Sequence, residues 1–147
     1  MPPSQNNPYI TKSINKYSSA QQNDSNLRKG ILMYAQLIAK LELARSAMIS
    51  DDRQSLKDHI KASEEVIMKL KLSLDTESQD EIVLIFDQLY NSIIHSLHGI
   101  IILNKPVEDL EDIIVDVRRL KEEFEKVDQR EGESSSFGQS GSKHIEC

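Results

Sequence analysis

Two histidines one helical turn apart are the side chains of this sequence best spaced for a chemical site. His95 and His98 could share a metal ion with Asn91 or with a more distant ligand. Both lie close to Asp87, Gln88 and Asn91, on a polar stretch where solvated histidines are common. The pattern therefore favours exposed histidines over a metal centre, and we expect no metal and no cofactor.

The other patterns that would indicate catalysis are missing from the sequence. Helical bundles that hold two metal ions need inward Glu-x-x-His pairs, and the sequence contains none. No glycine-rich loop follows a strand-like run, which argues against a nucleotide site. The carboxylates fall at polar helical positions, without the apolar surroundings that retune a catalytic acid. We therefore expect that the protein is not an enzyme.

Composition limits the class of protein and of partner. A length of 147 residues fits one domain, and 38% hydrophobic residues with five Gly and four Pro suit a helical fold. The net charge of −6 opposes binding to nucleic acid or anionic lipid, so we expect a protein partner. The single cysteine, Cys147, cannot form an internal disulfide, and no signal peptide or membrane-spanning apolar run is recognisable. We therefore expect a cytoplasmic protein that does not insert into membranes.

Four stretches of helical periodicity must position any site. They cover about residues 24–49, 53–74, 78–104 and 107–127. Short links hold consecutive helices antiparallel, so the expected fold is an all-α, up-down-up-down four-helix bundle with a short N-terminal helical arm. The third helix opens with a capping box formed by Ser78 and Glu81, and its broad apolar stripe predicts that it is the central helix.

The ends of the chain differ in character from this bundle. The expected parts are an arm with a short helix, the bundle and a disordered tail rich in Ser and Gly, at residues 1–23, 24–128 and 129–147. In the arm, Tyr9, Ile14 and Tyr17 fall roughly one turn apart, which favours a docked segment. A disordered leader is the alternative, because terminal segments often lack order.

The first long helix carries apolar residues on two sides. Opposite its core face lies a second stripe, formed by Leu32, Ala39, Leu43 and Ala47. A purely solvated face would be polar, so the stripe predicts a surface that binds a partner helix. Contact with the N-terminal arm, or a simple choice of good helix formers, is the alternative explanation.

With the helices placed, the sequence resembles the FliS family of flagellar secretion chaperones. In the first long helix, residues 31–34 read ILMY and residues 41–44 read LELA, like the family's aliphatic run ending in tyrosine and its later LE-x-A. The LY pair at residues 89–90 is similar to the family's pair in its third helix. Tyr17 resembles the tyrosine that precedes the first long helix.

The resemblance extends along the chain, with departures. It runs from about Tyr9 to Val127, and the end of the second helix is similar as well, at residues 66–67, 70 and 73–75. The departures are AQ for the usual DG, QD for GG, II for AN and a phenylalanine near the customary tryptophan, at residues 35–36, 79–80, 100–101 and 124. These changes bear on partner details more than on the fold.

The resemblance implies a cytoplasmic export chaperone. Such a protein binds the C-terminal helical segment of flagellin, prevents its premature polymerisation, delivers it to the flagellar export apparatus and so supports flagellum assembly. The candidate partner-binding residues are then Leu32, Ala39, Leu43 and Ala47, with Tyr9, Ile14 and Tyr17 of the arm. By analogy with the family, the arm covers part of the site when no client is bound.

Two other classes of function stay open from the sequence. The main alternative is a helical dimerising or adaptor module unrelated to flagella, because a bundle pattern does not decide function. A small metal protein is the third class, weakened by the missing inward ligands. Oligomeric state stays open too, and a homodimer is compatible with the pattern.

Overall fold

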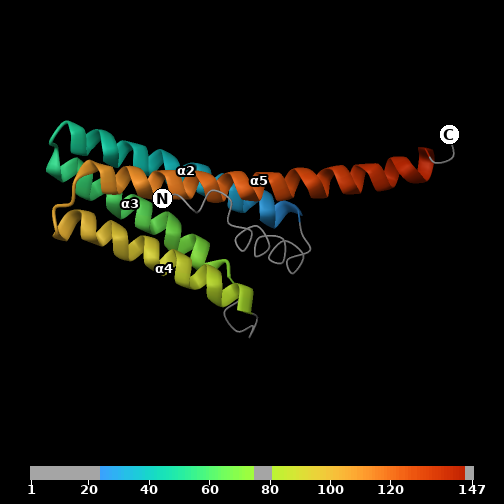
Figure 1. The fold of residues 1–147 in the computed structure, drawn as a ribbon, viewed down its shortest axis with the longest axis horizontal. Coiled ribbons are helices and arrows are strands. Elements are labelled where there is room, and N and C mark those ends of the chain that lie inside the picture. The colour runs from blue at the N-terminus through green and yellow to red at the C-terminus, as the bar shows by residue number, and fades with distance from the viewer. Residues whose placement is uncertain (1–23, 75–80, 145–147) are drawn as a thin grey trace.

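Four helices, close to the four periodic stretches of the sequence, make up the structure. The computed structural model describes residues 24–74 and 81–144, with the side chains of residues 27–74 and 81–129. Its helices are α2 (Asp24–Ile49), α3 (Arg53–Leu72), α4 (Glu81–Ile102) and α5 (Val107–His144) (Figure 1). The described residues contain no strand. The predicted all-α class and its four helices are therefore confirmed.

A polar turn separates α2 from α3, as the sequence predicts. Asp51 adopts a left-handed backbone with φ 59°, and the backbone N–H of Asp52 donates to the carbonyl of Ala47 at 2.8 Å. The Asp52 carboxylate then accepts from the backbone N–H and the hydroxyl of Ser55, which caps the start of α3 and lowers the pKa of Asp52. The turn thus satisfies helix ends on both sides while it reverses the chain.

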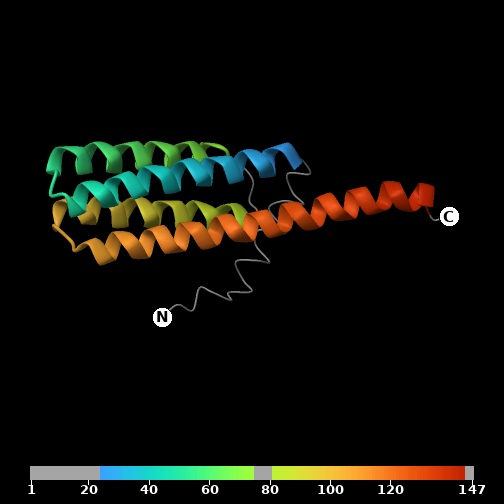
Figure 2. The ribbon, with the colours of Figure 1, turned by 90° about the horizontal axis from the view of Figure 1, so that it is seen from above.

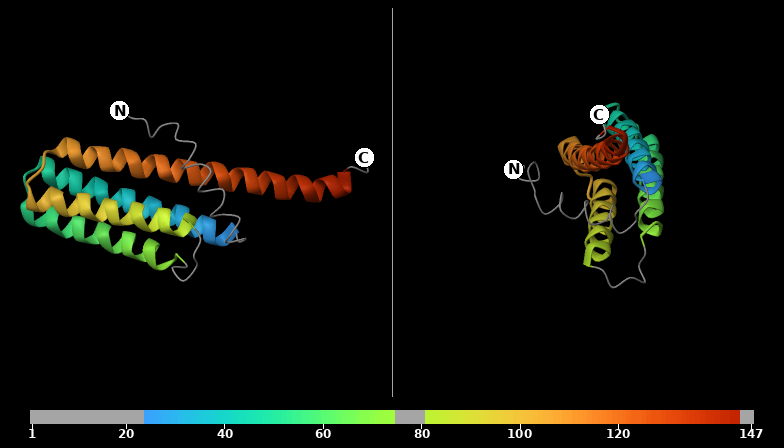
Figure 3. Two further views of the ribbon diagram at one scale, coloured as in Figure 1. Left: turned by 60° about the horizontal axis from the view of Figure 1, so that its bottom comes forward. Right: turned by 90° about the vertical axis from the view of Figure 1, so that its right-hand side faces the viewer.

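The helices form a ring in which consecutive members run antiparallel. Each helix contacts two neighbours, in the order α2, α3, α4, α5 and back to α2 (Figures 2 and 3). α2 packs the most closely against its neighbours and α4 the least. The expectation that the third helix is central is therefore wrong, and α2 has that place. The stripe of α4 is broad because half-buried residues such as Ile93, Ile94 and Ile101 flank its fully buried core residues.

The core takes fully buried side chains from every helix. Leu41, Ile67, Leu97 and Leu110 come from α2, α3, α4 and α5 respectively. Leu89, which lies on the apolar stripe of α4, is only half-buried and packs against this core. All four helices therefore contribute side chains to one core. The face of each helix that points away from this core remains exposed.

An aromatic cluster joins the two diagonal helices inside the bundle. The Tyr34 ring of α2 lies 5.1 Å from the Phe124 ring of α5, and Phe124 lies 5.9 Å from Phe86 of α4. The hydroxyls of Tyr34 and Tyr90 hydrogen-bond at 2.6 Å from α2 to α4. These two tyrosines end the ILMY and LY motifs that carry the family resemblance, and here they meet at the centre of the fold.

The C-terminal part of the chain departs from the sequence prediction. Residues 129–144, for which a disordered tail is expected, continue α5 as helix (Figure 1). Once a helix has formed, each further residue that joins it gains one hydrogen bond. The segment contains no proline that would interrupt the helix. The predicted arm at residues 1–23 and the cap residue Ser78 lie outside the described residues.

Candidate functional site

The outward side of α2 carries no charge along most of its length. Its exposed residues between positions 32 and 46 are Leu32, Ala35, Gln36, Ala39, Leu43 and Ser46, called here the α2 face. The face extends over about 21 Å, given a rise of 1.5 Å per residue. Charged residues make up 29% of the chain, whereas the exposed residues of this strip include none.

Two leucines make the α2 face apolar as well as uncharged. The side chain of Leu32 is 63% exposed and that of Leu43 is 47% exposed. A single exposed leucine is ordinary, whereas apolar side chains gathered on an uncharged strip are typical of a contact surface. Leu32, Ala39 and Leu43 lie on this surface as the sequence predicts.

Ala47 does not belong to the α2 face, contrary to the sequence prediction. Its side chain is 6% exposed and lies in the core. Each step of four residues turns a helix about 40° beyond a full turn, so the row from Ala39 through Leu43 to Ala47 rotates away from solvent. The α2–α3 turn also reaches Ala47, whose carbonyl accepts from Asp52. The surface therefore ends before Ala47.

The outward side of α3 shows what an ordinary solvated face looks like in this protein. Its exposed residues are Arg53, Gln54, Lys57, Asp58, Lys61, Glu65, Met68, Lys69 and Leu72. Most of these are charged, and both signs are present. The absence of charge on the α2 face is therefore a local property and does not extend to every helix of the bundle.

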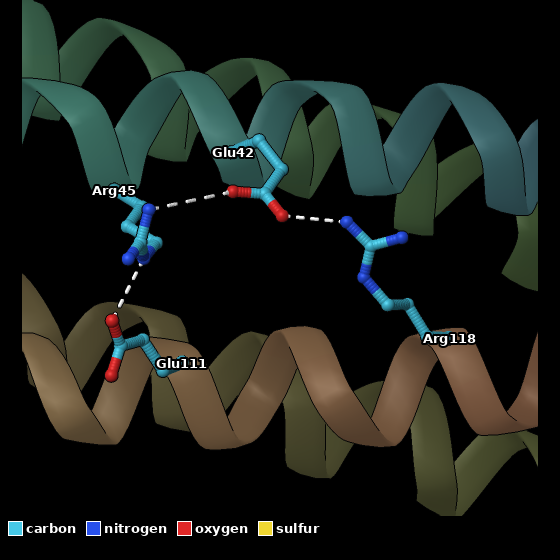
Figure 4. A network of polar contacts seen from close by, with 4 residues as sticks. All are labelled: Glu42, Arg45, Glu111 and Arg118. Atoms are coloured by element: carbon cyan, nitrogen blue, oxygen red, sulfur yellow. Dashed lines mark hydrogen bonds and ion pairs between the residues drawn. The ribbon is translucent and has the colours of Figure 1, made fainter.

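Ion pairs close the seam between α2 and α5 beside this face. Figure 4 shows Glu42 between two arginines, with Oε2 of Glu42 2.6 Å from Nη2 of Arg118 and Oε1 4.0 Å from Nη1 of Arg45. Nε of Arg45 donates to Oε2 of Glu111 at 2.8 Å, which raises the pKa of the Arg45 guanidinium above its usual value. Exposed pairs of this kind add little to stability, so their main effect is to orient α5 against α2.

The two histidines considered for a metal site from the sequence are exposed on α4. Nε2 of His98 lies 2.9 Å from Oε2 of Glu64 on α3, while Oδ1 of Asn91 accepts from Lys71. The described residues hold no group of three or more His, Cys, Asp or Glu side chains placed to bind one metal ion. Partial desolvation raises the pKa of Asp116, yet this carboxylate sits on the exposed side of α5. We therefore place the candidate site on the α2 face.

The arm residues cannot be placed beside the α2 face. Tyr9, Ile14 and Tyr17 lie outside the described residues, so their predicted role in binding stays a prediction.

Within residues 24–74 and 81–144, no helix is both long enough and apolar enough to cross a membrane.

The sequence of this bundle matches a known protein family. The family model described as flagellar protein FliS matches residues 7–131, which is most of the chain. The chain belongs to the FliS family. None of the curated proteins matches it. The resemblance from Tyr9 to Val127 is thereby confirmed, and the match covers the α2 face of this FliS-family member entirely.

Sequence reasoning missed part of the surface. It followed one row of spaced apolar residues and so left out Ala35, Gln36 and Ser46, which are exposed and uncharged as well. The missing signal was available in the sequence, because residues 30–39 of this FliS-family chain contain no charged residue. The absence of charge at exposed helical positions marks the face better than apolar spacing alone.

Proposed function

We propose that this FliS-family protein is a cytoplasmic export chaperone that binds flagellin and keeps it from polymerising before export. The observation that carries the proposal is the α2 face, an uncharged strip with the exposed leucines Leu32 and Leu43. Such a strip suits the apolar side of an amphipathic helix. The match to the flagellar protein FliS family supports a flagellar role for the chain.

The client segment is the C-terminal helical part of flagellin. Full burial of a leucine side chain contributes about 1.5–3 kcal/mol, and ordering of the client opposes this gain. Two partly exposed leucines therefore account for a large share of the available binding energy. Ala35, Ala39 and Ser46 are small, so they let the backbone of a client helix approach closely.

The support beneath the α2 face suits a binding surface. Leu41 and Tyr34, on the opposite side of α2, are buried, and ion pairs hold α2 against α5. A helix fixed in this way does not have to be ordered when the client binds, so binding costs less entropy. In this proposal the N-terminal arm, through Tyr9, Ile14 and Tyr17, covers part of the surface until the client displaces it.

The proposed role contains no catalytic step. The chaperone holds its client and then delivers it to the flagellar export apparatus. The family match favours this role over a helical adaptor module unrelated to flagella.

Co-purification and polymerisation test the proposal together. The full chain should retain flagellin from cells that produce it, and it should slow the polymerisation of purified flagellin at a one-to-one ratio. A variant without residues 1–20 should retain flagellin equally or better, because a covering arm subtracts its own docking energy from client binding. Unaltered polymerisation in the presence of excess chain would contradict the proposed function.

A further inference from the structure

The α2 face lies on a basic helix, although the whole chain is acidic. Residues 27–49 contain four Lys or Arg residues and one acidic residue, whereas residues 107–129 of α5 contain nine acidic and four basic residues. The net charge of −6 is therefore distributed unevenly along the chain. A partner on the α2 face responds mainly to the charges beside it, because salt at about 0.15 M screens exposed charges more than about 8 Å away.

Charges along the edge of the α2 face beside α5 are already paired. Arg28, Glu42 and Arg45 all form ion pairs with side chains of α5, at 2.6–3.3 Å between the charged atoms. Each of these charges has an opposite charge next to it. This edge therefore offers little net charge to a partner.

The opposite edge of the α2 face carries two lysines without an acidic partner. Two residues along a helix turn it by about 200°, so Lys40 lies across the α2 face from Glu42. Eleven residues make about three full turns, so Lys29 and Lys40 share this edge. The side chain of Lys29 is exposed and that of Lys40 is half-buried. Within residues 27–74 and 81–129, neither lysine has an ion-pair partner.

Each of these lysines stands one turn from an exposed leucine. Lys29 precedes Leu32 by three residues, and Lys40 precedes Leu43 by three residues. Residues three apart are neighbours on a helix surface. The combination of an ammonium group and an exposed leucine therefore occurs twice, about 17 Å apart. A helix that covers both leucines has one of its edges beside both ammonium groups.

We infer that the α2 face selects an amphipathic helix whose apolar stripe is bordered on one edge by Asp or Glu residues about three turns apart. The inference rests on the proposed function for its surface and adds the charge that selects the partner. Carboxylates of the partner pair with Lys29 and Lys40 while its apolar side chains cover the two leucines. Charges at the rim of an interface give specificity and faster association more than affinity. A partner with lysines at the same edge is rejected by like-charge repulsion.

Two synthetic helices that differ only in the charge of one edge test the inference. Both carry the same stripe of leucine and alanine, and one has glutamates where the other has lysines. In about 0.15 M salt the full chain should bind the glutamate helix about tenfold more tightly, because two exposed contacts change from attraction to repulsion. The net charge of −6 alone predicts the reverse order. Equal affinities, no binding of either helix, or preference for the lysine helix would overturn the inference.

Charge reversal on the chain locates the preference. The double variant Lys29→Glu, Lys40→Glu should prefer the lysine helix, because both contacts then have the opposite sign. The double variant Lys57→Glu, Lys61→Glu is the matched control, since it makes the same change of net charge on the exposed side of α3. This control should still prefer the glutamate helix, and thermal melts check that both variants are folded. If the control loses the preference as fully as the first variant, overall charge selects the partner and the inference is wrong.

Flagellin separates the inference from the proposed function. A chain that distinguishes the two helices but retains no flagellin would contradict the proposed client and support the inference. A chain that retains flagellin but binds both helices equally would contradict the inference and leave the proposed client in place.

Discussion

α2 and α4 stand at opposite corners of the bundle and both present uncharged outward faces, yet they are supported differently. α2 packs closely against α3 and α5, and ion pairs such as Arg45–Glu111 fix it to α5. α4 packs less closely, and Ile85, Leu89 and Ile93 along it are only half-buried. The difference teaches that an uncharged outward face does not depend on close packing of the helix that carries it: α2 joins such a face to tight support, whereas α4 leaves apolar side chains only partly covered.

The largest expected effects come from the buried leucines of the two helices. Leu41→Ala on α2 and Leu97→Ala on α4 should each lower the free energy of unfolding by about 2–5 kcal/mol, because both side chains are completely buried. Leu41→Ala should cost more, since α2 has the closer packing. Urea denaturation measures both, with half-buried Leu89→Ala as the comparison expected to cost less. If Leu97→Ala lowers the free energy of unfolding clearly more than Leu41→Ala does, α4 and not α2 is the central helix of the bundle.

The hydrogen bond between Tyr34 and Tyr90 gives the next largest effect. Tyr34→Phe or Tyr90→Phe leaves the other hydroxyl without this buried partner, and each should cost about 1–3 kcal/mol. The double variant should cost less than the sum of the two, because one interaction is removed twice. Additive losses in the double-mutant cycle would show that the diagonal contact does not couple α2 to α4.

The smallest expected effect concerns the ion pairs beside α2. Arg118→Met should lower the free energy of unfolding by less than about 1 kcal/mol, because the pair with Glu42 is exposed. The difference between wild type and variant should shrink further in 1 M NaCl. A loss of several kcal/mol would mean that α2 is held by charge more than by its core.

The positions of the helices could be predicted because local chemistry marks them. Asp24 begins α2, Asp52 caps α3 and Pro106 precedes α5, and each signal needs only neighbouring residues. Neither the central helix nor the burial of Ala47 could be predicted in the same way. The choice of central helix depends on how closely each helix packs against its neighbours. The burial of Ala47 depends on which side of α2 meets a neighbouring helix. The sequence of residues 129–144 has a composition typical of a tail, yet in the structure it continues the long helix that precedes it.

Only part of the candidate binding surface on α2 could be predicted from the sequence. Leu32, Ala39 and Leu43 follow from helical spacing, while Gln36 and Ser46 are recognised only once the outward side of α2 is known. The spacing of His95 and His98 raises the possibility of a metal site, and the structure places His98 beside Glu64. Spacing indicates which residues share a face, but only packing decides whether that face is inside.

Calorimetric titration with a C-terminal fragment of flagellin tests the central claim most directly. Leu43→Asp should weaken binding at least tenfold, because a client helix would have to bury the new charge, while its thermal melt stays near that of the wild type. Leu72→Asp on α3 and Leu84→Asp on α4 are the matched controls and should bind like the wild type. If Leu43→Asp binds as tightly as these controls, the α2 face is not the client site.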